Sequence, residues 1–177
     1  KPTVVFKVLR DGVPMDIQTL PADISSGPSF LLAYAGAQGD ILAPAEYNNL
    51  GRAAGQPASV SLANLRAGTA GSLTASATAG AWSAFINTAF PAGSTLRAIG
   101  LQGAFNQKVE GVDVPRRVVS VTFPVGSDEP RRDVVNSDKC SSCHERLELH
   151  GGSRVGNIDI CVMCHNPSLS TSGRGAD

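Results

Sequence analysis

The sequence predicts a mainly β protein: a Greek-key β-sandwich or split barrel, followed by a small module that is mostly irregular with short helices. Two observations predict this arrangement. Residues 1–126 are rich in Ala, Gly, Ser, Thr and Val, and turn residues break their short apolar runs, as in all-β folds. After Gly126 such runs become rare, and all four cysteines lie in this last part. We therefore expect two domains, residues 1–126 and residues 127–177.

Five apolar runs of the first domain have the pattern of β-strands, at residues 3–10, 29–34, 82–87, 95–102 and 119–125. The first run ends at Asp11-Gly12, a dipeptide typical of hairpin turns. In the last run, alternate residues from Val119 to Val125 are apolar and so point to one face. Together with the turn spacing, these runs predict a sandwich or barrel of about seven strands.

Two other features of the first domain bear on its core. Residues 40–56 are expected to form a short helix or a long loop, and Pro44 suits the first turn of a helix. Trp82 lies in an apolar run, so we expect it to pack in the core.

The second domain is predicted to begin with a short helix. Residues 136–138 are Asn, Ser and Asp, a cluster typical of helix N-caps. The helix is expected to run through Leu149 and to end at Gly151. A segment of about fifty residues is normally too small to bury a sufficient core by itself. It therefore needs another source of apolar packing.

The cysteines form two Cys-x-x-Cys-His motifs, at residues 140–144 and 161–165. This is the pattern of covalent c-type haem attachment. The two sulfurs bond to the vinyl groups of the porphyrin, and the histidine that follows ligates the iron. We therefore expect two haems c, attached through Cys140, Cys143, His144, Cys161, Cys164 and His165. Their porphyrins would supply the missing core.

A zinc ribbon is the alternative, because two Cys-x-x-Cys pairs at this spacing also suit a four-cysteine zinc site. The histidines favour haem. The chain has three histidines, and two of them directly follow the cysteine pairs, where a zinc ribbon does not need them. Disulfides within the pairs would close small, strained rings. Thioredoxin-like redox chemistry would need a βαβ pattern, which neither pair has.

The third histidine, His150, lies between the two motifs and precedes Gly151-Gly152. It is either a solvated loop residue or the second axial ligand of one iron. To reach back over the iron of His144, it would have to wrap around the porphyrin within at most about 20 Å of chain. We therefore expect His150 and His165 to share one iron, with the glycines letting the backbone pass close to the porphyrin or turn with positive φ.

Three histidines cannot fill four axial positions. The iron of His144 is thus expected to be five-coordinate, or to take a methionine, an amine, or a ligand from another chain or from beyond Asp177. Met163 lies inside an attachment motif and Met15 in the other domain, so we expect neither to be this ligand. The deficit indicates that the chain is part of a longer protein or is completed by a partner.

Composition excludes other classes of function. The formal net charge is zero and 17% of residues are charged, so nucleic acid is not an expected partner. No apolar run approaches the about 18 residues of a membrane-spanning helix. Because c-type haem is attached outside the bacterial inner membrane, the motifs imply export, although no signal peptide is visible.

The last third of the chain resembles the outer-membrane decahaem c-type cytochromes of metal-reducing bacteria. The matching residues are Val134-Val135-Asn136, Lys139–His144, Leu147–Gly152, Arg154 and Cys161–Pro167. The first domain is similar in composition and position to the first Greek-key domain of that family. The resemblance implies bis-histidine haems, a surface or extracellular location, and electron delivery to minerals, metal ions or flavins. The chain departs from the family in carrying two haem motifs.

The expected function is therefore electron transfer between haems toward extracellular acceptors: metal oxides, metal ions, flavins or a partner cytochrome. Other copies of the chain are a further expected type of partner. We expect the protein to transfer electrons and not to act as an enzyme, although it could reduce metals as the terminal step. A haem enzyme or gas sensor with an open site at the iron of His144 is one alternative, and a zinc-ribbon structural protein is another. The expected location is the cell surface, outer membrane or exterior, with the periplasm as the alternative.

Overall fold

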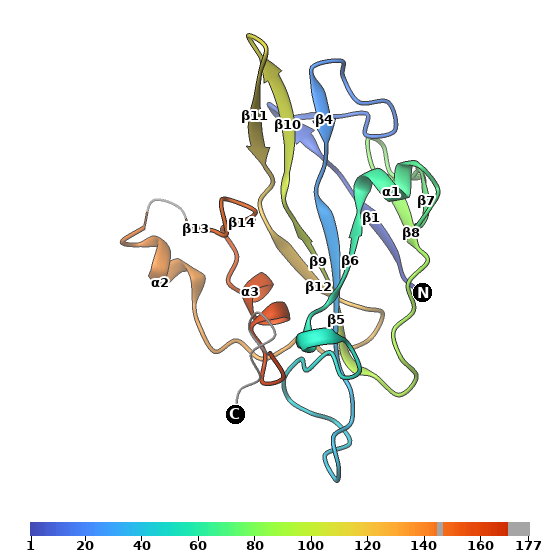
Figure 1. Ribbon diagram of the computed structural model, residues 1–177, viewed down its shortest axis with the longest axis vertical. Helices are drawn as coiled ribbons and strands as arrows, with labels where there is room; N and C mark the ends of the chain where they lie inside the picture. Colours follow the sequence, from blue (N-terminus) through green and yellow to red (C-terminus); the bar gives the residue numbers. More distant parts are fainter. Residues whose placement is uncertain (145–146, 170–177) are drawn as a thin grey trace. The chain divides into compact units, whose positions relative to one another are not determined.

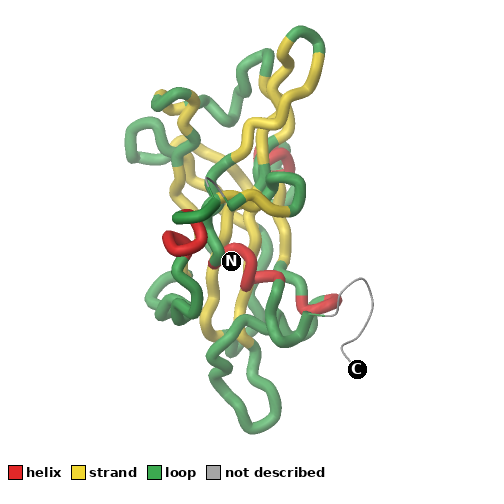
Figure 2. Tube along the Cα trace, turned by 90° about the vertical axis from the view of Figure 1, so that its left-hand side faces the viewer, coloured by secondary structure: helices red, strands yellow, loops and turns green. Residues whose placement is uncertain are grey.

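The computed structural model describes residues 1–144 and 147–169 (Figure 1). Two compact units are present, and each combines separate stretches of the chain. The first unit consists of Lys1–Pro28, Val60–Ala89 and Ala104–Arg116, and the second of Ser29–Ser59, Phe90–Gly103 and Arg117–Asp177. Strands predominate and the helices are few and short, so the predicted mainly β class is confirmed (Figure 2). The predicted boundary at Gly126 separates two domains that we expect to fold independently, and it stays a prediction.

The first unit contains two three-stranded sheets and one hairpin. One sheet has the order β1 (Thr3–Phe6), β8 (Trp82–Ile86), β7 (Gly71–Ala75), and the other the order β11 (Val112–Arg117), β10 (Ala104–Val109), β4 (Ile24–Ser26). The hairpin pairs β2 (Leu9–Arg10) with β3 (Val13–Pro14). Its turn residues Asp11 and Gly12 have φ angles of 53° and 82°, as a two-residue I′ turn requires. The predicted hairpin is therefore confirmed.

Helix α1 (Leu62–Arg66) packs in this unit against β7 and β8. Ser61 caps it, with its side chain accepting a hydrogen bond from Asn64 N at 3.1 Å. Leu62 and Leu65 are buried. Trp82 is partly buried, and its indole N–H donates to Met15 O at 3.3 Å, so its apolar body packs while its polar edge is satisfied.

The second unit is built on a four-stranded sheet with the order β12 (Val121–Pro124), β9 (Thr95–Gln102), β5 (Ser29–Ala35), β6 (Ala58–Ser61). Strands β12 and β5 both run antiparallel to the central β9. Six consecutive residues of β5, from Phe30 to Ala35, are buried, as expected of a strand covered on both faces. Strand β9 has the bounds predicted for it.

Two predicted features of this unit differ in detail. Of the two alternatives predicted for residues 40–56, a short helix or a long loop, the structure has the loop. It contains one short 3-10 turn, η1 (Ala53–Gly55). In the run 119–125, the alternating residues Val119, which precedes β12, and Phe123 are 65% and 64% exposed, so the apolar face of this run is not the buried one. That pattern predicted a strand correctly but says nothing about which side is covered.

Helix α3 (Asp159–Cys164) covers one face of this sheet, where it contacts β5, β9 and β12 (Figure 1). Ile160 and Met163 project from it into the core and are 1% and 0% exposed. The core cluster that they join consists of Leu31, Ala33, Tyr47, Ala98, Ile160 and Met163. The second Cys-x-x-Cys-His motif therefore belongs to a helix with a well-buried apolar side.

Candidate functional site

The first Cys-x-x-Cys-His motif begins in helix α2 (Ser137–Ser141). Asn136 caps this helix, with Oδ1 accepting from Asp138 N at 2.8 Å, as the N-cap cluster predicts. The expected continuation to Leu149 is wrong, because residues 148–149 form a strand. Cys140 is partly buried, whereas Cys143 and His144 are exposed. This motif thus lies on the surface of the unit.

The second motif lies in α3, with His165 as the residue that ends the helix. Cys161 and Cys164 are three residues apart and so lie on the same side of α3. Both are partly buried, and burial raises the pKa of both thiols, while the guanidinium of Arg154 opposes the rise. The His165 N–H donates to Cys161 O at 2.7 Å, so the last turn keeps its hydrogen bond.

Gly100 of β9 allows α3 to approach the sheet closely. A Cβ atom at this position would lie 2.6 Å from Met163 Sδ and would also overlap Ile160 Cδ1. Real Cβ atoms do not come so close to other heavy atoms. A side chain at position 100 would therefore force the Ile160 and Met163 side chains, which pack α3 against the sheet, to shift.

His150 lies in the turn of a short hairpin formed by β13 (Glu148–Leu149) and β14 (Arg154–Val155). The residues His150, Gly151 and Gly152 have φ angles of 54°, 66° and 84°. Both glycines thus adopt the positive φ expected of them. His150 itself has a backbone conformation that is uncommon for a residue with a Cβ atom, and such strain recurs at functional sites.

The hairpin is fixed to the second unit by contacts at both of its strands. Ser120 N donates to Val155 O at 2.9 Å, and Ser120 Oγ accepts from Val155 N at 3.1 Å. Arg117 forms an ion pair of 2.7 Å with Glu148. The same Arg117 side chain fills the space where a Cβ on Gly152 would lie. The backbone on both sides of His150 is therefore well anchored.

The hairpin and α3 bring His150 and His165 together. Their ring centroids are 5.9 Å apart and the ring planes are tilted by 41°. At this distance one metal ion would have room between the two rings, held by a nitrogen of each imidazole. The two histidines thus fit a shared iron, and both are exposed enough for a porphyrin to reach them.

The four cysteines do not converge on one point. All of them are free thiols. Among residues 1–144 and 147–169, which include every cysteine, no three His, Cys, Asp or Glu side chains are placed to hold a metal ion. A four-cysteine zinc ribbon requires such convergence. The arrangement is instead two separate pairs, each followed by its histidine, as haem attachment requires.

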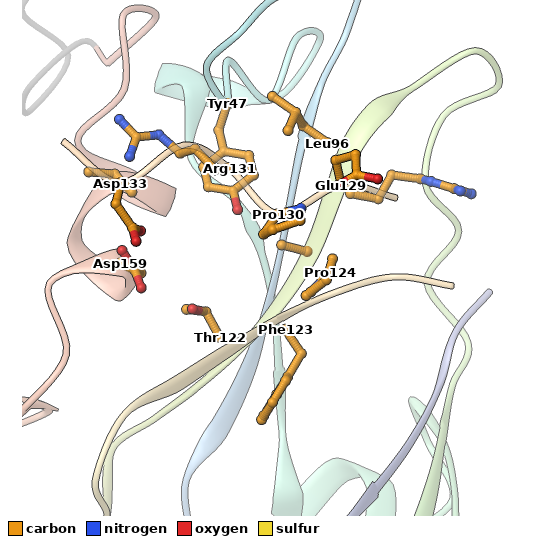
Figure 3. Close-up of a pocket in the computed structure, with 13 residues that line it drawn as sticks. Tyr47, Leu96, Thr122, Phe123, Pro124, Glu129, Pro130, Arg131, Asp133 and Asp159 are labelled. Atoms are coloured by element: carbon orange, nitrogen blue, oxygen red, sulfur yellow. The ribbon is translucent and has the colours of Figure 1, made fainter. Parts of the chain in front are cut away.

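A pocket beside the N-terminal end of α3 was not apparent from the sequence (Figure 3). Its volume is about 120 Å³, and the carboxylates of Asp133 and Asp159 face each other at its edge. Burial, and then the Asp133 charge, raise the pKa of Asp159, while burial raises that of Tyr47 to about 12. Arg131 also lines the pocket and forms an ion pair with Glu46. These residues come from three separate stretches of the chain, around positions 47, 132 and 159, and no local motif unites them.

Comparison with known proteins identifies the segment that carries both motifs. Residues 132–176 match the family model described as outer membrane cytochrome MtrC/MtrF-like, domains II/IV. Comparisons with curated proteins and with solved structures gave no match. In the part of the chain that the structure describes, none of the helices has the length and apolar character needed to cross a membrane.

Proposed function

Because residues 132–176 belong to the MtrC/MtrF-like outer membrane cytochrome family, we propose that this chain is an electron carrier with two covalently attached haems c. The family is one of multihaem cytochromes of extracellular electron transfer. Haem iron, when bound, supplies a centre that accepts or gives up one electron. The residues proposed to hold the two haems are Cys140, Cys143, His144, Cys161, Cys164, His165 and His150.

The observation that carries this proposal is the pairing of His150 with His165. The backbone around each histidine is held by contacts within the second unit, and the two ring centroids lie 5.9 Å apart. A backbone that is fixed before the cofactor binds limits how far the ligands can move when the charge of the iron changes. A carrier benefits from this, because its axial ligands then stay in place in both oxidation states.

The proposed acceptors are metal oxides, metal ions, flavins or a partner cytochrome outside the cell, reached from the cell surface. Residues 127–177 include eight acidic and six basic side chains. Because the numbers of acidic and basic side chains are nearly equal, this segment does not favour a strongly charged partner. Contact with other copies of the chain is proposed as a further route for electrons.

The haem of His144 supports a second candidate function. His144 is exposed. Among the described residues, the ring contact between histidines joins His150 and His165 and does not include His144. An iron with a free sixth position can bind a small molecule, as haem enzymes and gas sensors do. We therefore propose ligand binding at this iron as the alternative to pure electron transfer.

A haem count tests the proposed function. The intact mass should exceed that of the polypeptide by two haem groups, and a pyridine haemochrome spectrum should give the same number. The colour should survive extraction with acidified acetone, because thioether bonds hold the porphyrin. A colourless chain containing zinc would refute the proposal.

A further inference from the structure

Helix α3 ends in backbone carbonyls that need hydrogen-bond donors from elsewhere. The last four carbonyls of any α-helix have no donor within the helix. At the end of α3 the chain leaves the helical conformation at His165, where ψ is 76°. The carbonyls of Met163 and Cys164 therefore depend on other parts of the chain, immediately before the proposed ligand His165.

Asn49 supplies one of these donors from the 40–56 loop. Its side chain is 0% exposed, and Nδ2 donates to Met163 O at 2.9 Å and to Gly55 O at 2.7 Å. Its Oδ1 accepts from Tyr34 N at 3.1 Å. Both donor hydrogens and the acceptor of this buried amide are thus used, which fixes its orientation.

Two further amides support the same end of the helix. Gln56 Nε2 donates to Cys164 O at 3.3 Å. Asn166 Nδ2 donates to Gly55 O at 2.8 Å, to Cys164 O at 3.2 Å and to Met163 O, which it shares with Asn49, at 3.3 Å. Gly55 comes so close to Ser168 that a Cβ atom there would meet Ser168 O at 2.5 Å. The loop and the residues flanking His165 are therefore joined on both sides of the histidine.

We propose that Asn49 is a positioning residue for the axial ligand His165. This rests on the proposed ligation of haem by His165. Asn49 does not reach the imidazole ring; it fixes the Met163 carbonyl, and with it the backbone from which the ring projects. Because the direction of an axial imidazole affects the iron's spin state and potential, a loop 114 residues earlier in the chain would tune this haem.

The neighbouring residue Asn48 offers a matched control. It is also buried, at 2% exposed, and its side chain makes a similar number of hydrogen bonds. These go to Gly36 N at 2.8 Å, Gly36 O at 2.7 Å and Leu50 N at 3.1 Å. Asn48 thus stabilises the same loop without touching α3.

The test compares Asn49→Gly with Asn48→Ala in the full chain loaded with haem. Glycine is chosen because Asn49 has φ 45°, which glycine adopts without strain, so that the amide is removed without forcing another side chain into this conformation. In Asn49→Gly we expect loss of most of the low-spin signal of the His150–His165 haem by electron paramagnetic resonance, together with a shifted midpoint potential. In Asn48→Ala we expect a lower melting temperature with the signal and potential unchanged.

Gln56→Ala is a milder second variant, since it removes the hydrogen bond to Cys164 O and leaves Asn49 in place. It should change the signal in the same direction and by less. If Asn49→Gly does not fold, the result with Gln56→Ala decides. Unchanged spin state and potential, or equal changes in Asn48→Ala, would overturn the positioning role. A wild-type chain without covalent haem would instead overturn the proposed function.

Discussion

Gly100 of β9 lies directly against Met163 of α3, so closely that no other residue fits at position 100 unless the Ile160 and Met163 side chains shift. We expect Gly100→Ala to destabilise the second unit by about 1–3 kcal/mol, the usual cost of overpacking a core. Urea unfolding measures this cost. The variant should also weaken the low-spin signal of the second haem.

A double variant tests whether this cost arises at the helix. Ile160→Val removes Cδ1, the atom that the new Cβ would overlap. Alone it should cost about 0.5–1.5 kcal/mol. Combined with Gly100→Ala it should cost less than the sum of the two, because the overlap is relieved. Strict additivity would mean that Gly100 acts elsewhere.

Replacing His150 should alter one haem and leave the other intact. In His150→Met we expect mixed histidine–methionine ligation or a partly high-spin iron, with a higher potential, since axial methionine raises it. Visible spectra and redox titration report both. Leu149→Ala is the control, because Leu149 is an exposed neighbour in the same hairpin. An unchanged spectrum in both oxidation states would make His150 an ordinary loop residue.

The haem of His144 should bind carbon monoxide. With His150 and His165 paired, the iron of His144 has no remaining histidine in this chain. The reduced, isolated chain should therefore take up about one carbon monoxide per chain, in competition with added imidazole. We expect the missing ligand to come from outside residues 1–177. Two low-spin haems that ignore carbon monoxide in a dilute monomer would contradict this.

Removing the first haem should disorder only the segment around it. Every residue of α2 is at least partly exposed, whereas α3 buries Ile160 and Met163 against the sheet. In the variant with Cys140 and Cys143 both replaced by serine, amides of α2 should exchange faster while those of α3 stay protected. Loss of protection in both helices would show that the first haem supports the whole module.

The ion pair between Arg97 and Asp128 should make stability depend on pH. Hydrogen bonds from Arg97 lower the pKa of Asp128, and its Oδ2 also accepts from Arg97 N at 2.8 Å. The stabilisation is complete above the unfolded carboxyl pKa, near 3.8, and is lost as pH falls through the lower pKa of the folded state. Asp128→Asn should therefore cost about 1 kcal/mol at pH 7 and less at pH 2.

Local patterns were sufficient to predict several elements. Strand β9, the turn at Asp11-Gly12 and the N-cap Asn136 all follow from residues close together in sequence. The helix expected through Leu149 was wrong because residues 148–149 pair with β14, and because Arg117 holds Glu148 through an ion pair. Such contacts between distant residues outweigh local helix preference.

In the candidate site, too, some features follow from local sequence and others depend on contacts between distant residues. The two motifs could be read directly, because their spacing is fixed by the chemistry of attachment. Asn49 could not, since an asparagine in a loop is common and its importance depends on meeting Met163 O across 114 residues. That His150 and His165 share one iron was predicted from chain reach and stays a prediction, with the ring centroids 5.9 Å apart.

The separate anchoring of the hairpin and of α3 has an evolutionary consequence. Ser120 and Arg117 hold the His150 hairpin, whereas Gly100 and Asn49 hold the helix that ends at His165. We therefore expect the distance between the two rings to depend on these anchoring residues more than on the residues that connect the hairpin to α3. We expect residues inserted or deleted between β14 and α3 to change this distance little, so that this connection could vary in length during evolution while the histidine pair is kept.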